Sequence, residues 1–524
     1  MKSLSDTSVQ FVKGVGPQKK KRILAFSVFL ITLFVSLLSI NHYEQLGRMS
    51  GLTEEYTDVA KYLLEYGMEY PHDEIQYVYR PPGYIFFLKT ILRFPSHIPR
   101  TDGKELEQAI EHFKMIPEWR STPVFELENK LIFAAQAVFF GGSALVLFLL
   151  LCRFSSLRQA FLLAIAYGLN VYLIILVGMY HYSVVHLFFV MLSCYVTVLA
   201  LEKKEAQTAL LLLSGIFWGL TTLIRPTTLI LPVFFLVFLV FYFKKDTKKI
   251  VPSIMMFSLG MLLAVFPQTC KNYSKTHRII PVNAQTWIVL WANTVEQGKV
   301  SQNHANWWSI WSSKGMPIYQ RVTNKESYYF LNIIKYNMEL EDAFKAETIK
   351  NLKHQPQVLV KNLMRNFGSF FMNINSVTIN IFQALQEKDS SSVDMLEWVR
   401  PGHPQGFYPP HAQRLFEGLH FYLLFLSGFG TYFAFLKKEK TVLFLFCVFL
   451  CFAIAHTITA VGFMYYYIKM PFLILLSGYT IVCATQSKLT FWPKSVLLNY
   501  GNLALVILLS LEFILLYLVF LPAV

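Results

Sequence analysis

The sequence predicts an all-α integral membrane protein with about eleven transmembrane helices. Hydrophobic residues make up 54% of its 524 residues and charged residues only 15%, well below the roughly 25% charged residues of a typical soluble domain. Several apolar runs reach the roughly 20 residues that a helix needs to cross a bilayer. Only helices and closed barrels satisfy their backbone hydrogen bonds in lipid, so runs of this length predict helices.

Eleven segments are apolar and long enough to be expected to cross the membrane. The first follows the basic run 19–22 and lacks a small-residue cleavage site, so we expect a retained anchor and not a cleaved signal peptide. The expected spans are 23–41, 131–152, 157–177, 183–201, 208–223, 228–243, 250–267, 415–436, 441–460, 469–486 and 498–520.

The charges between these spans predict their orientation. Every second connection is short and basic, as in "KKDTKK" at 244–249 and "KKEK" at 437–440. Short loops rich in Lys and Arg stay in the cytoplasm. The amino terminus is therefore expected in the cytoplasm of a plasma (inner) membrane and, after an odd number of spans, the carboxyl terminus outside. The net charge of +15 is mostly an orientation signal and does not predict nucleic-acid binding.

This orientation places both long polar segments outside the cell. They are a first outer loop at 42–130 and a second segment at 268–414, which is expected to form an outer cap. Four regions follow: a basic cytoplasmic amino terminus, a transmembrane core that includes the first outer loop, the cap, and carboxyl-terminal transmembrane helices. Their expected bounds are 1–22, 23–267, 268–414 and 415–524.

The first outer loop contains a predicted juxtamembrane helix, "TEEYTDVAKYLLEYG" at 53–67. A threonine can cap its start and a glycine can end it. Aromatic and apolar residues recur at i, i+3 and i+4, so one face can lie on the membrane. The first turn then holds Glu54, Glu55 and Asp58 just above the bilayer. These carboxylates could serve as a general base or bind a substrate, or they could only favour the helix dipole.

A rigid cationic segment follows in "YRPPGY" at 79–84. Pro81 and Pro82 fix φ, remove two backbone donors and disfavour helix before them. The chain is therefore expected to reach the apolar run 85–88 through an extended segment that holds Arg80 at the membrane edge. A cation at this depth is costly unless it faces an anion or snorkels to water.

Further motifs follow in a definite order. They are "GLTTLIRPTTLILP" at 219–232, "FPQTCKNYSKTHRIIPVNAQTWIVLWANT" at 266–294, an outer helical stretch at 339–367, and "MYYYIKMPFLIL" at 464–475. With the acidic helix and the Arg-Pro-Pro segment, they resemble the membrane glycosyltransferases of the GT-C superfamily over about 23–480. The likeness is to the branch of the bacterial protein O-mannosyltransferases and the lipid A aminoarabinose transferase.

The sequence departs from that family in three places. The family's acid four residues before Tyr56 is Leu52 here, so Glu54 or Glu55 would have to serve from a shifted position. A lysine, Lys271, replaces the usual arginine after the seventh span. In the late span the usual arginine is Met464, and the nearest cation is Lys469.

The resemblance implies the roles of ten residues. Catalysis would fall to a carboxylate among Glu54, Glu55 and Asp58. The cations expected to bind the donor phosphate are Arg80, Arg225, Lys271 and Lys469. The residues expected to line the substrates are Tyr56, Tyr84 and Asn272.

The resemblance also implies the reaction. One sugar would move from an undecaprenyl- or dolichyl-phosphate donor to a glycan, lipid or protein acceptor on the outer face, in a single inverting displacement. No cofactor is expected. The reaction is also expected to be metal-independent, because Arg and Lys can neutralise a leaving monophosphate and no carboxylate cluster lies beyond 54–58. The six cysteines lack metal-ligand spacing and imply no disulfide framework.

Three alternatives remain open at this point. A lipid-linked glycan ligase or polymerase would use a diphosphate donor. A transporter or flippase would place ionisable residues or Gly/Pro breaks near the midplane of two matching halves. A non-catalytic scaffold would need no site. The histidines inside or beside spans favour packing or helix–helix hydrogen bonds over chemistry: His181, His186 and His456.

Overall fold

The computed structural model describes residues 16–49, 81–93, 123–178, 181–203, 207–243, 247–296, 314–324, 336–372, 410–458 and 466–486. Every regular element within these ranges is a helix. The expected all-α class is therefore confirmed.

Seven of the described helices are long and apolar enough to cross a membrane. They match seven of the predicted spans, which supports a multi-pass membrane protein. They are α2 (Pro17–Met49), α6 (Pro123–Leu151), α9 (Ser183–Glu202), α10 (Gln207–Ile224), α12 (Ile250–Thr276), α22 (Lys440–Ile458) and α23 (Tyr466–Gln486). The expected last span, 498–520, lies outside the described residues.

The other expected spans are shorter apolar helices. One is the apolar part of α21 (Pro410–Lys437), at Tyr422–Lys437, and another is the 3-10 turn η2 (Pro226–Ile230) with α11 (Leu231–Tyr242). The prediction of one helix over 157–177 is wrong: the chain forms α7 (Leu157–Gly168) and α8 (Val171–Val177). The break has a local cause, because the side chain of Asn170 accepts the N–H of Leu173 at 3.2 Å and starts a new helix as an N-cap does.

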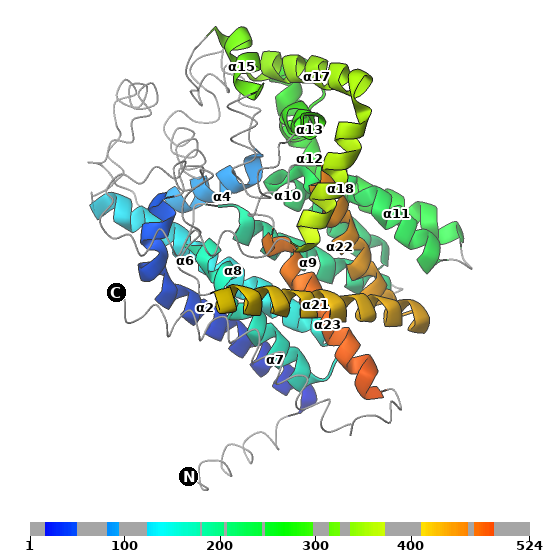
Figure 1. Ribbon diagram of the computed structural model, residues 1–524. Helices are drawn as coiled ribbons and strands as arrows, with labels where there is room; N and C mark the ends of the chain where they lie inside the picture. The colour runs from blue at the N-terminus through cyan, green and yellow to red at the C-terminus, as the bar shows by residue number, and fades with distance from the viewer. Residues whose placement is uncertain are drawn as a thin grey trace.

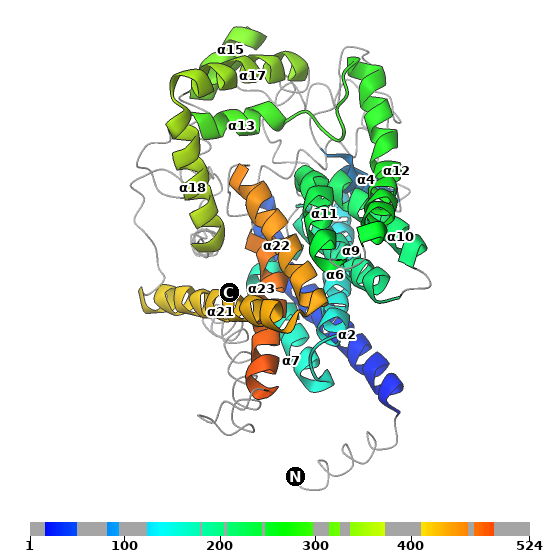
Figure 2. The same ribbon diagram turned by 90° about the vertical axis from the view of Figure 1, so that its right-hand side faces the viewer.

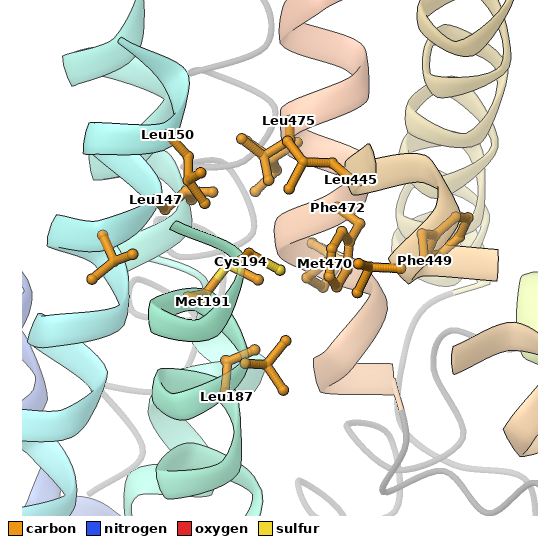
Figure 3. Close-up of a cluster of buried hydrophobic side chains, with 14 of the residues drawn as sticks. Leu147, Leu150, Leu187, Met191, Cys194, Leu445, Phe449, Met470, Phe472 and Leu475 are labelled. Carbon is orange, nitrogen blue, oxygen red and sulfur yellow. The ribbon is translucent and has the colours of Figure 1, made fainter. Parts of the chain in front are cut away.

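The helix α23 lies at the centre of the bundle, since 94% of its apolar stretch, Tyr467–Ala484, is buried. Figure 3 shows side chains of α6, α9 and α22 that meet those of α23. The labelled side chains there are Leu147 and Leu150 of α6, Leu187, Met191 and Cys194 of α9, Leu445 and Phe449 of α22, and Met470, Phe472 and Leu475 of α23. Because lipid is as apolar as these side chains, close packing holds such helices together.

The helices α10 and α12 touch backbone to backbone. A Cβ added at Gly215 would lie 2.0 Å from the carbonyl oxygen of Phe257, and one at Gly260 would lie 2.1 Å from that of Leu212. Small residues permit this approach, as they do in other membrane helix pairs. The contact fixes α10, which ends just before Arg225, against α12, which carries Lys271.

A group of helices lies at the end of the molecule opposite the start of α2 (Figures 1 and 2). It consists of α13 (Thr286–Thr294), α15 (Met316–Thr323), α17 (Asn337–His354) and α18 (Pro356–Met372). The first three share a buried apolar cluster that includes Trp291, Tyr319 and Phe344. Asn366 of α18 donates to the side chain of Asn293 in α13 at 2.7 Å, which joins the descending helix to this cluster.

A buried carboxyl group joins α17 to the start of α13. Glu341 is 6% exposed, and its Oε2 accepts the backbone N–H of Trp287 at 2.9 Å. Its Oε1 has no hydrogen-bond partner within the structure as described. Burial raises the pKa of Glu341 to about 7, although the backbone N–H groups of Trp287 and Ile288 oppose this shift.

This pKa predicts that the stability of the α13–α17 contact falls as pH rises. The folded state holds the Glu341 proton more tightly than the unfolded state, so the stabilisation is full below about pH 4.5 and is lost by about pH 7. The loss amounts to about 3 kcal/mol. Hydrogen exchange of the α13 and α17 amides should therefore be faster at pH 8 than at pH 5, after correction for intrinsic rates. Glu341→Gln should remove most of this pH dependence, and an unchanged dependence in that variant would contradict the assignment.

Candidate functional site

Arg225 stands at the end of α10 because a proline follows it. Pro226 disfavours helical backbone at the preceding residue, and Arg225 is extended, with φ −151° and ψ 119°. Its own N–H still donates to the carbonyl of Thr221 at 2.9 Å, which closes the last turn of α10. The side chain is nevertheless buried, with 6% exposure.

Two tyrosines from other segments contact the Arg225 guanidinium, and a histidine contacts one of them. Its Nη1 donates to the hydroxyl of Tyr467 on α23 at 3.1 Å. That hydroxyl also lies 2.9 Å from Nδ1 of His186 on α9. The guanidinium carbon lies 5.5 Å from the ring centroid of Tyr182, in cation–π contact. We call these four residues the Arg225 site.

The donor and acceptor groups fix the direction of each of these hydrogen bonds. A guanidinium donates only, so the Tyr467 oxygen accepts from Arg225 and its O–H can donate to Nδ1 of His186. In that arrangement a neutral His186 carries its proton on Nε2. The Nε2 atom is buried and has no hydrogen-bond partner in the described part of the chain. The site therefore joins a buried cation to a histidine that retains donor capacity.

The segment that follows Arg80 reaches this site. It forms α4 (Pro82–Leu92), and a Cβ added at Gly83 would lie 2.7 Å from the backbone nitrogen of Ile224. The Tyr84 ring meets that of Tyr182 edge-on, with centroids 6.5 Å apart. Tyr84 was expected to line the substrates; it is fully buried and donates to Gln136 at 3.1 Å. It therefore supports Tyr182 beneath Arg225.

The close approach at Gly83 gives a testable prediction. Gly83→Ala should push α4 away from the end of α10, because the new methyl group would meet backbone atoms of Ile224. We expect a loss of about 1–3 kcal/mol of stability, as for other overpacked contacts. Thermal unfolding of the purified protein measures it. Gly428→Ala in α21 is the matched control, since nothing lies within 4 Å of its added Cβ. Equal melting temperatures for the two variants would refute the contact.

Lys469 lies at the junction of α18, α21 and α23. It is 1% exposed, and its ammonium group donates to the carbonyl of Phe370 at 2.7 Å and lies 3.4 Å from Nε2 of His420. The carbonyl end of a helix favours a cation, so Lys469 stabilises the end of α18. Residues two positions apart on a helix do not share a face. Lys469 therefore lies on a different face of α23 from Tyr467.

Lys271 and Asn272 lie in the last two turns of α12, which extends beyond the expected end of this span at 267. The Asn272 amide donates to the carbonyls of Ile280 and Val282 at 2.8 and 3.0 Å. Asn272, an expected lining residue, thus fastens the chain that follows α12. The charged neighbours of Lys271 are Lys275 on the same helix and Lys89 on α4.

Five residues of the expected site lie outside the described residues: Glu54, Glu55, Tyr56, Asp58 and Arg80. Their roles stay predictions. Within the ranges that the structure covers, no group of three or more His, Cys, Asp or Glu side chains could hold a metal ion.

Sequence reasoning placed Arg225 at a site but missed Tyr467, His186 and Tyr182, which surround it there. Tyr467 lies inside a quoted motif, yet nothing in "MYYYIKMP" distinguishes it from its tyrosine neighbours. His186 was expected to pack at an interface. The contact joins residues 281 positions apart, and helix periodicity carries no information on such pairs.

No model of a known protein family matches this chain, and a search of curated proteins finds no similar sequence. Among solved structures, the chain is similar to the Archaeoglobus fulgidus oligosaccharyltransferase in its apo form, with 12% identity and a TM-score of 0.45 over 93% of this chain and 55% of that one. It is also similar to oligosaccharyltransferase AglB of the same organism in complex with an inhibitory peptide and a dolichol-phosphate, with 13% identity and a TM-score of 0.47 over 93% and 54%. The chain spans about half the length of these structures.

Proposed function

We propose that this chain is a membrane glycosyltransferase of GT-C type that uses a polyprenyl-phosphate sugar as donor. The observation that carries the proposal is the Arg225 site, in which a 6% exposed arginine at the end of an apolar helix lies beside the start of α4. The acceptor would be a glycan, lipid or protein on the non-cytoplasmic face.

A lipid-linked phosphate meets the chemical requirements of this position. Its tail can stay in the bilayer while its anionic group lies at the level where the apolar helices end. A guanidinium can bind two phosphate oxygens at once, and its positive charge at this level attracts an anionic ligand. Arg80, which directly precedes Pro81 and α4, is the second proposed phosphate ligand.

The proposed reaction is one inverting displacement. Glu54 or Glu55 accepts the proton of the acceptor hydroxyl while its oxygen bonds to the anomeric carbon. The bond between that carbon and the phosphate oxygen breaks, and the electron pair leaves with the polyprenyl phosphate. Arg225 and Arg80 stabilise the charge that grows on this leaving group, an effect that lowers the barrier because it is stronger in the transition state.

Product analysis tests this function. Membranes that contain the full chain are incubated with undecaprenyl-phosphate sugars, and the released undecaprenyl phosphate is measured by mass spectrometry. We expect release that persists in EDTA and that Arg225→Gln strongly reduces at limiting donor. Cleavage of a diphosphate-linked donor alone would instead indicate a ligase or polymerase. Movement of intact donor across the bilayer without cleavage would indicate a flippase.

A further inference from the structure

The polar and apolar faces of α18 are reversed relative to those of a helix that contacts water. Asn362 and Asn366 are buried, with 2% and 6% exposure. Val360, Met364 and Phe367 recur at i, i+4 and i+7, which places them on one side of the helix, and they are 56%, 72% and 42% exposed. We call these three residues the exposed apolar face of α18.

The buried asparagines fix the direction of this face. The Asn362 amide donates to the carbonyls of Asn293 and Val295 at 2.8 and 2.9 Å. The Asn366 amide donates to the Asn293 side chain at 2.7 Å and to the carbonyl of Thr457 in α22 at 3.3 Å. Buried polar groups need such partners, so the polar side of α18 cannot turn outward without losing these hydrogen bonds.

The carboxyl end of α18 runs alongside α22 to the middle of that helix. The ring centroids of Phe370 and Phe371 lie 6.0 and 5.8 Å from that of Phe449. Phe449 is the middle residue of α22, a helix long and apolar enough to cross a membrane. Both views show α18 descending from α17 to the level of α22 (Figures 1 and 2). The last turn of α18 therefore reaches the middle level of a membrane span.

Buried side chains bind the carbonyl groups at this end of α18. A helix leaves its last carbonyls without intrahelical partners, and at membrane depth the protein itself must satisfy them. Lys469 of α23, 1% exposed, donates to the carbonyl of Phe370 at 2.7 Å. Nε2 of His420 on α21, 2% exposed, lies 2.7 Å from the carbonyl of Phe371. These contacts meet the requirement of a helix end inside a bilayer.

The length of the exposed apolar face fits half a bilayer. From Phe371 back to Met364 the helix rises about 10 Å, and from Phe371 to the exposed Lys361 about 15 Å. Half of the hydrocarbon core is also about 15 Å thick, so Lys361 stands at the level of the headgroups. Arg365 lies one turn deeper and is partly exposed. Its side chain leans toward the start of the helix, so its charge can reach the same level.

We propose that α18 enters one leaflet of the bilayer as a half-span helix, and that its exposed apolar face contacts the acyl chains of that leaflet. The leaflet is the one nearer to α17. Hydropathy along the sequence does not reveal such a helix, because its asparagines, Lys361 and Arg365 interrupt the apolar residues. The segment expected to form an outer cap then includes a helix inserted in the membrane. The proposal rests on the contacts of α18 and is independent of the proposed reaction.

Photocrosslinking identifies what covers this face. The photoreactive residue p-benzoylphenylalanine replaces Met364 in the full chain, which is placed in phosphatidylcholine nanodiscs without donor or acceptor and irradiated. Mass spectrometry then identifies the adduct on the labelled peptide. We expect about tenfold more phosphatidylcholine adduct at Met364 than at Lys353, because acyl C–H groups surround only a label in the hydrocarbon core.

The controls share the exposure of Met364 but differ in their expected surroundings. Lys353 is exposed on α17, and Leu263 is 54% exposed on the membrane-spanning helix α12. The label should crosslink to lipid at Leu263 and also at Phe367, one turn below Met364. A lipid adduct no more abundant at Met364 than at Lys353 would overturn the proposal, since the face would then meet water. An adduct to another peptide of the chain would also overturn it, since protein would then cover the face.

Discussion

Arg225→Gln is expected to reduce use of the polyprenyl-phosphate sugar by about 30- to 1000-fold at limiting donor, which corresponds to a loss of about 2–4 kcal/mol. Glutamine retains a hydrogen-bond donor but lacks the charge that would meet the phosphate in a buried position. The loss should appear in the specificity constant for the donor, measured from the release of polyprenyl phosphate.

Two companion variants show whether the geometry around Arg225 matters. Tyr467→Phe removes the hydroxyl that accepts from Arg225 at 3.1 Å, and it should cost about tenfold, as expected for one lost hydrogen bond. Arg158→Gln removes an arginine at the start of α7 and should leave donor use unchanged. Parental donor use in correctly inserted Arg225→Gln would remove this residue from the site.

The Glu54→Gln/Glu55→Gln double variant is expected to lower turnover by about 100- to 10,000-fold, the usual contribution of a general base. Glutamine keeps the size and hydrogen bonding of glutamate but cannot take the acceptor proton. The loss should therefore fall on turnover, while binding of the polyprenyl-phosphate sugar is retained.

The single variants separate the two carboxylates. Glu54 is the position nearer to the family's acid, so Glu54→Gln is expected to have the larger effect. Asp58→Asn, one turn further along the predicted helix, should change turnover less. A double variant that is inserted correctly and still turns over at the parental rate would refute a carboxylate mechanism at this position.

The length of the apolar runs predicted most of the described helices. The spans that became α2, α9 and α22 could be read from the sequence because lipid imposes a minimum length on an apolar helix. The break at Asn170 was missed because one amide side chain, which accepts the N–H of Leu173, outweighs an otherwise continuous apolar run. The extension of α12 to Thr276 was missed because polar residues continue the helix beyond the apolar segment.

The candidate site could be predicted only in part. The Arg-Pro pair at 225–226 marks a cation at a helix end, and the structure places Arg225 there. The three expected phosphate ligands that the structure describes, however, do not share one environment in the fold. Lys469 donates to the backbone of α18, and Lys271 neighbours Lys275 and Lys89. The partners of each cation depend on packing between helices that are distant in sequence. The spacing of residues along the chain does not predict this packing.

The location of the donor phosphate is the central claim, and a cryo-electron microscopy structure of the full chain in nanodiscs with a bound polyprenyl phosphate tests it most directly. We predict phosphate density within hydrogen-bonding distance of the Arg225 guanidinium, beside the start of α4. Phosphate density only at Lys89 and Lys271, with no anion beside Arg225, would contradict the account.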